Sequence, residues 1–218
     1  MRAKEVIKRY ILFVIGLYFI GMGIAFTRHG ELGVSPISSV ANILSYKFTF
    51  WSMGEWLTFT NFLFIAAQIL ILRKNFKLVQ LLQIPLSFLF GVFTDICLGM
   101  ISSIPTDTYY MQFLMVVLGV VVLAFGVALT VIANVIMNSG EAIVKAISDT
   151  LKKNFGNVKI VFDVSWVAFS ILLSLIFFDM QIVGTREGTI IAAVCTGAVS
   201  KVFIKWLSPI DKILRGNK

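Results

Sequence analysis

The sequence has few charged residues, two cysteines and one histidine, and each shortage excludes a class of protein. Only 14% of the 218 residues are charged and 58% are hydrophobic. A soluble domain with so much apolar surface would need more charged residues to cover it, so we expect a membrane protein. Cys97 and Cys195 lie in different apolar runs, so we expect neither a disulfide framework nor a metal site. His29 is the sole histidine, and no catalytic triad pattern, phosphate-binding loop or nucleic-acid patch is present. We therefore expect no enzyme, no cofactor and no nucleic-acid partner.

Long apolar runs dominate the sequence, whose mean hydropathy is +0.93. A helix needs about 20 apolar residues to cross the core of a bilayer. Six segments approach that length: 10–27, 54–72, 78–101, 109–133, 160–178 and 188–206. The basic N-terminus and the run behind it resemble a signal peptide but lack a small-x-small cleavage site, so we expect a retained first span. These segments predict an all-α polytopic protein of the lipid bilayer.

The distribution of lysine and arginine predicts the topology. With the N-terminus in the cytoplasm, only Arg28, Lys47 and Arg186 lie on the outer side, which leaves 16 of the 19 basic residues inside. This is the positive-inside pattern of membrane proteins, and it accounts for the net charge of +8 without nucleic acid. We predict a multi-pass protein of the cell membrane with cytoplasmic N- and C-termini.

The two halves of the chain repeat one order of elements: span, short helix, span, span. "GIAFT" at 23–27 aligns with "GVALT" at 126–130, an offset of 103 residues. Gly54 then aligns with Gly156, and Gly91 with Gly197, at offsets of 102 and 106. Because each unit contains an odd number of spans, two such units must lie in opposite senses across the membrane. The sequence predicts an inverted repeat.

Each repeat contains one helix that is too short to span the bilayer. We place the units at 1–106 and 107–218 of one membrane domain, with short helices at 35–47 and 139–153. Such a helix can lie flat among the lipid headgroups, or it can be re-entrant and direct its free N–H groups into a polar cavity. The second helix supports both placements about equally, because its charges at i,i+4 resemble a solvated face. The first has no charge before Lys47 and favours the re-entrant placement.

Polar residues on the short helices and in the spans are the candidate site residues. The candidates for substrate binding are Ser35, Ser38, Asn42, Asn138, Ser139, Glu141 and Thr189. The candidates for coupling or ion pairing are Arg28, Asn61, Asp95, Lys159 and Asp163, since a charge in a span is costly unless paired or hydrated. For Asp95 a functional role and a structural pair, for example with Arg28, have equal support. For Asp163 a local pair with Lys159 is slightly favoured.

Three stretches resemble a known family, the YczE/YyaS/YitT-type bacterial integral membrane proteins. "RHGELGVSPISSVANILS" resembles the family's Arg-x-Gly-Leu-Gly-x-Ser-Pro signature, with Glu31 as an insertion. "GEAIVKAISDTLKKNFGNVKIVFDVSW" and "GTIIAAVCTGAVSKVF" resemble its second and closing blocks, so the resemblance covers nearly the whole chain. Where the family often opens the second short helix with Gly-Pro, this chain has Ser139-Gly140. The resemblance implies a membrane protein of a family of mostly unknown function, some of whose relatives are grouped with proposed exporters.

Two functions from different classes fit these features. The first is a secondary transporter or exporter of a small polar or amphipathic solute, with protons as a candidate coupling ion. The alternative is a non-transporting scaffold or accessory protein of a larger complex or biosynthetic enzyme. A carrier of this size is consistent with a homodimer. A carrier needs buried short helices that line a cavity, whereas a scaffold would leave them flat in the interface.

The topology is testable at the connection 102–108, which carries no basic residue. A single cysteine placed there, in a chain lacking Cys97 and Cys195, should react with a membrane-impermeant maleimide from the outer side of intact cells. Labelling only after the cells are opened would contradict the inverted repeat.

Overall fold

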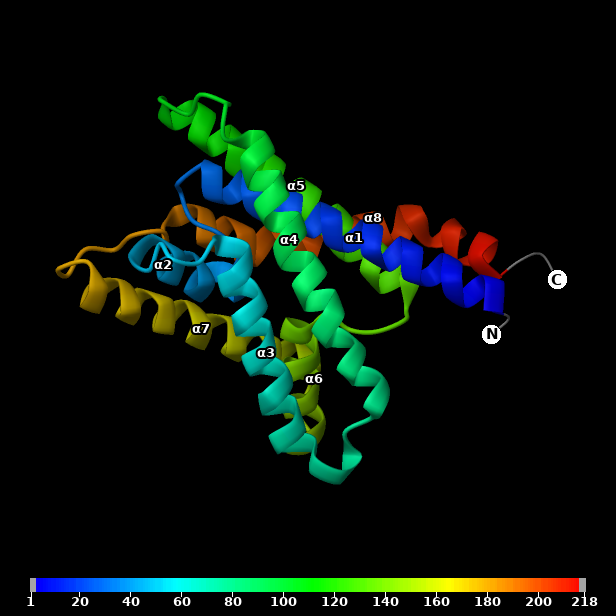
Figure 1. The fold of residues 1–218 in the computed structure, drawn as a ribbon. Helices are drawn as coiled ribbons and strands as arrows, with labels where there is room; N and C mark the ends of the chain where they lie inside the picture. Colours follow the sequence, from blue (N-terminus) through cyan, green and yellow to red (C-terminus); the bar gives the residue numbers. More distant parts are fainter. Residues whose placement is uncertain (1–2, 216–218) are drawn as a thin grey trace.

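The computed structural model describes the backbone of residues 3–215 and the side chains of residues 5–211 (Figure 1). All regular structure in these residues is helical. The helices are α1 Ala3–His29, η1 Pro36–Ser38, α2 Ser39–Lys47, α3 Met53–Leu72, η2 Arg73–Asn75, η3 Leu78–Leu82, α4 Gln83–Ile101, α5 Tyr109–Ala133, α6 Ser139–Leu151, α7 Phe155–Phe177 and α8 Glu187–Arg215. Six of them, α1, α3, α4, α5, α7 and α8, are long and apolar enough to cross a membrane, which confirms the six predicted spans.

The helices extend beyond the apolar runs at several ends. We predicted that the fifth span begins at residue 160, but α7 begins at Phe155, where the Asn154 side chain accepts a hydrogen bond from Gly156 N at 2.9 Å. Hydropathy misses this turn because Lys159 follows it, whereas a helix starts at its capping residue whatever the polarity of the first turn. The third span differs in the opposite way, because its first residues, Leu78–Leu82, form the 3-10 helix η3.

Both short helices are present, and neither lies free on the surface. In the first, Ser38, Ser39 and Asn42 are at most 1% exposed. In the second, Ser139 and Val144 are similarly buried. Each short helix packs against both α3 and α7. This burial favours the re-entrant placement over the flat one.

The most extensive helix contact joins α1 and α5, which cross in antiparallel orientation. A Cβ atom on Gly23 would lie 2.5 Å from Leu123 Cβ and 2.7 Å from Gly119 O. Two helical turns earlier on α1, a Cβ on Gly16 would lie 3.0 Å from Gly126 O. Glycine at these positions lets the two backbones touch, which is how membrane helices gain van der Waals contact without a hydrophobic driving force.

The contacts of these four glycines agree with the predicted internal repeat. The offset of 103 residues relates Gly16 to Gly119 and Gly23 to Gly126, and each glycine touches the counterpart of the other. Thr27 and Thr130, which the same offset relates, each donate a hydrogen bond to the carbonyl three residues before, at 2.9 and 2.8 Å. Two equivalent helices in opposite orientations would make this pattern.

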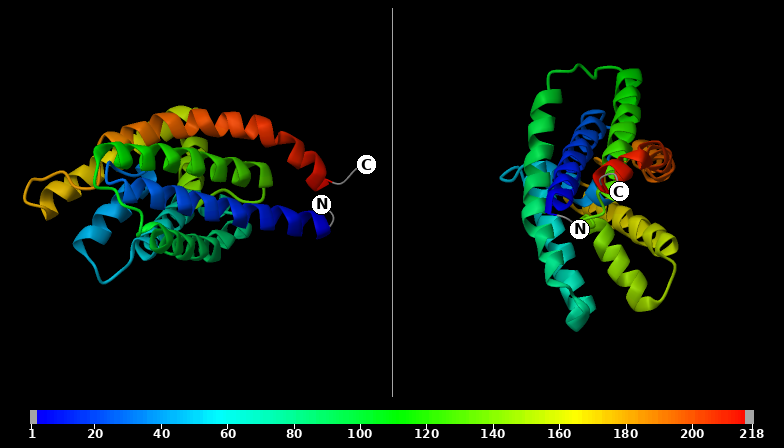
Figure 2. Two further views of the ribbon diagram at one scale, coloured as in Figure 1. Left: turned by 90° about the horizontal axis from the view of Figure 1, so that it is seen from above. Right: turned by 90° about the vertical axis from the view of Figure 1, so that its right-hand side faces the viewer.

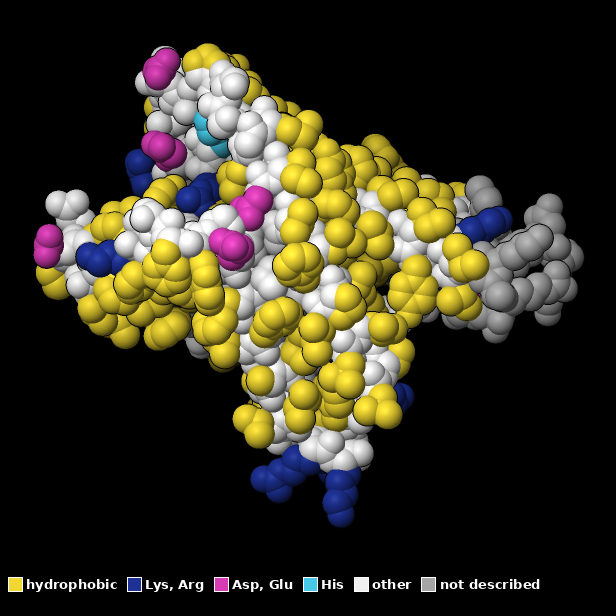
Figure 3. All heavy atoms as spheres, viewed as in Figure 1, with side chains coloured by type: hydrophobic (Ala, Val, Ile, Leu, Met, Phe, Trp, Pro, Cys, Tyr) yellow, Lys and Arg dark blue, Asp and Glu magenta, His cyan; other side chains and the backbone are white. Residues whose placement is uncertain are grey.

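The helices form two groups that diverge from each other. One group contains α1, α5 and α8, which run side by side (Figure 2), and the other contains α3, α6 and α7 with α2. Helix α4 crosses between the groups and packs on both α1 and α3 (Figure 1). Hydrophobic side chains cover most of the face shown in Figure 3, and basic side chains gather at the tip where η2 joins α3 to α4.

The glycine contact can be tested by adding one methyl group. We expect Gly23→Ala to destabilise the protein by about 1–3 kcal/mol, because the methyl would overlap Leu123 and the α5 backbone. Gly99→Ala on α4 is the matched control, since nothing lies within 4 Å of a Cβ there. Thermal unfolding of the purified variants in detergent measures both. Equal melting temperatures would show that the helices are not closely packed at Gly23.

Candidate functional site

A cavity of about 300 Å³ lies between the two groups of helices. It is lined by Ser35 and Ser38 at the start of the first short helix, and by Asn138 and Glu141 at the start of the second. The long helices complete its walls. We call this space the central cavity. It brings together residues more than a hundred positions apart in the sequence, at the place where each short helix begins.

The lining of the central cavity is mostly apolar, with a few polar side chains. The long helices α1, α3, α4 and α5 contribute large apolar side chains, namely Ile20, Ile24, Leu57, Phe90, Leu123 and Val127. Polar side chains come from the starts of the short helices and from α3, α5, α7 and α8. A mostly apolar pocket with a few placed polar groups is typical of sites for small organic ligands.

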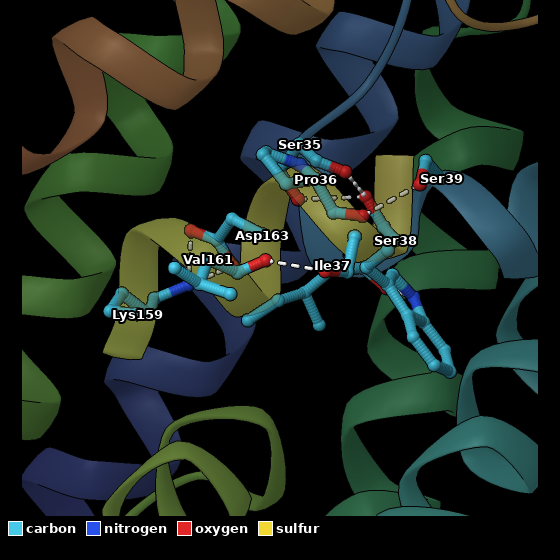
Figure 4. Close-up of polar contacts among 10 residues, drawn as sticks. Ser35, Pro36, Ile37, Ser38, Ser39, Lys159, Val161 and Asp163 are labelled. Atoms are coloured by element: carbon cyan, nitrogen blue, oxygen red, sulfur yellow. Dashed lines mark hydrogen bonds and ion pairs between the residues drawn. The ribbon is translucent and has the colours of Figure 1, made fainter. Parts of the chain in front are cut away.

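The start of the first short helix is held by its own hydroxyl groups. Ser35 Oγ lies 2.7 Å from Ser38 Oγ, and Ser38 Oγ donates to Ser35 O at 2.9 Å (Figure 4). Pro36 occupies the first helical position, where the N–H it lacks would have no partner within the helix. Trp166 on α7 donates its Nε1–H to Ile37 O at 3.1 Å. The turn is therefore fixed against α7 and presents its serines to the cavity.

The start of the second short helix places an acid in the cavity. Glu141 lies in the first turn of α6, where its N–H donates to Asn138 O at 2.9 Å. Glu141 lines the central cavity, and its carboxylate has no hydrogen-bond partner among the described residues. Burial raises the pKa of Glu141 above its ordinary value, and the Lys159 ammonium opposes part of that shift. Within the described part of the chain, Glu141 is thus a protonatable group without an ion-pair partner of its own.

Lys159 and Asp163 form an ion pair one turn apart on α7. The lysine Nζ contacts both carboxylate oxygens, at 2.5 and 2.6 Å, and both side chains line the central cavity beside the Ser35–Ser39 turn (Figure 4). This is the local pair that the sequence slightly favoured. Because the lysine is engaged by Asp163, it does not act as the direct partner of Glu141.

Two further polar atoms in the cavity wall are buried and have no hydrogen-bond partner among the described residues. They are Asn61 Nδ2 on α3 and Thr196 Oγ1 on α8. Asn61 is only 4% exposed. Asn42 Oδ1 and Thr189 Oγ1, outside the cavity lining, are in the same situation. A buried donor left unsatisfied costs about 1–3 kcal/mol, which a bound ligand with an acceptor would recover.

Three candidates for substrate binding lie away from the cavity lining. Asn42 donates from Nδ2 to Gly184 O at 3.2 Å, one helical turn beyond Ser38. Ser139 Oγ lies 3.1 Å from Ser87 Oγ on α4. Thr189 packs against Gly33, and its N–H donates to the Arg186 carbonyl at 2.9 Å. Their surroundings are those of residues that join helices and loops.

Arg28 and Asp95 also lie outside the lining, and each has a partner other than the one we considered. Asp95 accepts hydrogen bonds from Gly54 N at 2.8 Å and Ser52 Oγ at 2.5 Å, so it joins α4 to the first turn of α3. Arg28 donates to Ser45 Oγ at 2.7 Å and lies over the Tyr46 ring. The suggested pair between them is replaced by these separate contacts.

The sequence analysis missed the hydroxyl groups in the middle of the spans. Thr60, Thr130, Thr196 and Ser200 all line the cavity. Such residues usually bond to their own helix backbone, as Thr60 does to Trp56 O at 2.8 Å. A usable signal was the spacing on α8, where Thr196 and Ser200 are four residues apart and Ala192 precedes them by the same step, which marks one small and polar helix face.

No group of three His, Cys, Asp or Glu side chains within the described part of the chain could hold a metal ion.

The family model of DUF6198, a family of unknown function, matches residues 7–205. The chain is also similar to the uncharacterized membrane protein YczE of Bacillus subtilis (strain 168), with 25% identity over 198 residues that cover 90% of this chain and 85% of that protein. No solved structure matches the chain.

The raised pKa of Glu141 makes stability depend on pH in a defined direction. The folded protein holds the Glu141 proton more tightly than the unfolded chain does, so this contribution to stability is present in acid and lost as pH rises through the raised pKa. A glutamine at position 141 cannot ionise, so the Glu141→Gln variant should not lose this stability as the pH rises. Its melting temperature should exceed that of the parent by more at about pH 8 than at about pH 4.5.

The matched control is Asp149→Asn, which removes another acid of α6 whose partner is Lys145 on the exposed face, at 2.6 Å. We expect no gain in stability at high pH from this change. A Glu141→Gln difference that is constant with pH, or larger in acid, would contradict the assignment.

Proposed function

The chain belongs to the DUF6198 family of unknown function, and from this premise we propose that it is a secondary transporter or exporter of a small polar or amphipathic solute, with protons as the coupling ion. The observation that carries the proposal is the central cavity. The starts of both short helices line it, and it contains the Glu141 carboxylate and the Asn61 amide nitrogen, neither of which has a hydrogen-bond partner among the described residues.

The cavity residues support an inverted repeat with a site at its centre. The offset of 103 residues relates Ser35 to Asn138 and Ser38 to Glu141, and all four line the cavity. Secondary transporters built from inverted repeats bind their substrates at the repeat interface, where broken or partial helices end. The site is therefore where that architecture would place it.

The last two helices of the first repeat are closed against each other. Gly54 on α3 and Gly91 on α4 touch so closely that neither could carry a side chain. Thr58 Oγ1 donates to the Ser87 carbonyl across the same seam at 3.3 Å. Asp95 completes the seam by accepting from the first turn of α3. We call this the α3–α4 seam.

The equivalent helices of the second repeat, α7 and α8, stand apart (Figure 1). Gly156 and Gly197 are the counterparts of the seam glycines. A Cβ on Gly197 would meet nothing within 4 Å, and one on Gly156 would meet only the capping Asn154. Gly197 and Ile160 are both exposed and line the central cavity, so they mark its mouth.

This asymmetry between repeats supports alternating access. If the two repeats exchange conformations, α7 and α8 close at Gly156 and Gly197 while the α3–α4 seam opens, and the cavity then faces the other side of the membrane. Rocking of one repeat against the other around a fixed site is the usual motion of such transporters. The structure would correspond to one of the two end states.

Cross-linking tests the exchange. In a chain lacking Cys97 and Cys195, we expect Gly156→Cys with Gly197→Cys to form a disulfide under mild oxidation in native membranes. Asp95→Asn weakens the α3–α4 seam and should accelerate this cross-link several-fold, since about 1 kcal/mol of lost seam stability is a factor of about five in population.

The control for the seam variant is Glu55→Gln. Glu55 is also a carboxylate of the α3 start, but it accepts from Ser52 N of the same segment at 2.7 Å and does not reach α4. It should leave the cross-linking rate unchanged. If both thiols react with a maleimide but no disulfide forms in either background, α7 and α8 do not approach, and the scaffold or accessory role replaces the carrier.

A further inference from the structure

We propose that the central cavity selects a monovalent organic cation with a small apolar body, and that this cation and a proton compete for the Glu141 carboxylate. The inference rests on the proposed function, because it takes the central cavity as the substrate site. It adds the charge and shape of the substrate and the atom at which coupling occurs.

The charges that face the cavity leave one negative charge uncompensated. Three titratable side chains line it, namely Glu141 from α6 and Lys159 and Asp163 from α7. The last two neutralise each other through contacts at 2.5 and 2.6 Å. From the other packed elements come the Asn61 amide on α3 and hydroxyl and apolar side chains on α1, α5 and α8. Among the residues that the structure describes, an ionised Glu141 thus has no cation paired with it alone.

An unpaired carboxylate in a confined site is costly, and there are two ways to relieve that cost. The group takes up a proton, or a cation of opposite charge binds beside it. A neutral solute leaves the charge unpaired, and an anion is repelled by it. The two remedies exclude each other, because a protonated Glu141 no longer attracts the cation. One cation would therefore displace one proton.

The other lining residues indicate the size and polarity of the ligand. Besides the polar groups, the lining contains aliphatic side chains and the Phe90 ring, which favour an apolar group, and an aromatic ring can contact a cation through its face. Asn61 Nδ2 and Thr196 Oγ1 supply unsatisfied polar atoms for one acceptor group or a bound water. A cavity of about 300 Å³ accommodates an amine of roughly one aromatic ring.

Three probes of one shape and different charge test the selection. They are benzyltrimethylammonium, benzyl alcohol and benzoate, titrated by calorimetry into the full chain in lipid nanodiscs. At pH 7.5 we expect the cation to bind at least about tenfold more tightly than the other two, because a charge pair in a partly buried site is worth more than 1.4 kcal/mol. Its affinity should fall as the pH is lowered, with release of a proton that buffers of different ionisation enthalpy reveal.

Three variants test whether the cation preference and the proton release depend on the Glu141 carboxylate. Glu141→Gln should lose the cation preference and the proton release, whereas Asp149→Asn, on the exposed face of the same helix, should keep both. Glu141→Asp retains the charge and should retain a pH-dependent preference, and it separates loss of the carboxylate from misfolding. Equal binding of the three probes, preference for benzoate, or binding that is independent of pH would overturn the proposal.

The outcome is separable from that of the proposed function. Binding in nanodiscs does not require α7 to approach α8. Cation selectivity without the Gly156–Gly197 cross-link would keep the substrate class and reject the carrier. The cross-link without cation selectivity would keep the carrier and reject the substrate class.

Discussion

The antiparallel contact between α1 and α5 is the interaction on which the rest of the structure depends. Gly16 and Gly23 bring the α1 backbone against Gly126 and Gly119 of α5, so the first and the fourth span are joined. Helix α4 then packs on α1, and α8 packs on α5. The chain leaving each of these two spans enters a short helix, and because the spans are held together, both short helices begin beside one space. A side chain at Gly23 would separate the spans and remove the frame of the central cavity.

A second constraint is that polar backbone within a membrane must be satisfied or must face a cavity. The first short helix meets this constraint through Ser35 and Ser38, which bond to each other and to the local carbonyl. The second meets it less completely, since the Glu141 carboxylate has no hydrogen bond from the described residues while Lys159 is engaged by Asp163. The remaining polar atoms therefore converge on the central cavity. The proposal of a bound ligand rests on this electrostatic imbalance in the central cavity.

Sequence reasoning located part of this site for physical reasons that can be traced. Ser35, Asn138 and Glu141 were recognisable because helix starts carry free N–H groups and capping residues, and these signals are local. Asn42 and Thr189 have the same polar character but contact Gly184 and Gly33, because helix rotation and the path of distant loops decide which polar side chain faces a cavity. Thr196 and Asn61 could be judged only when their neighbours were known, since an unsatisfied hydrogen bond is a property of surroundings and not of residue type.

The sequence by itself determined that the chain is a six-span helical membrane protein with two short helices, because apolar length and capping residues act within one segment. It also predicts where the two halves correspond. The tertiary structure alone decided that the α3–α4 seam is closed while α7 and α8 stand apart, although both pairs contain glycines at the positions that the predicted repeat relates. The reason is that a glycine permits a close contact between two helices but does not enforce it, because the packing of the whole bundle decides which helices meet.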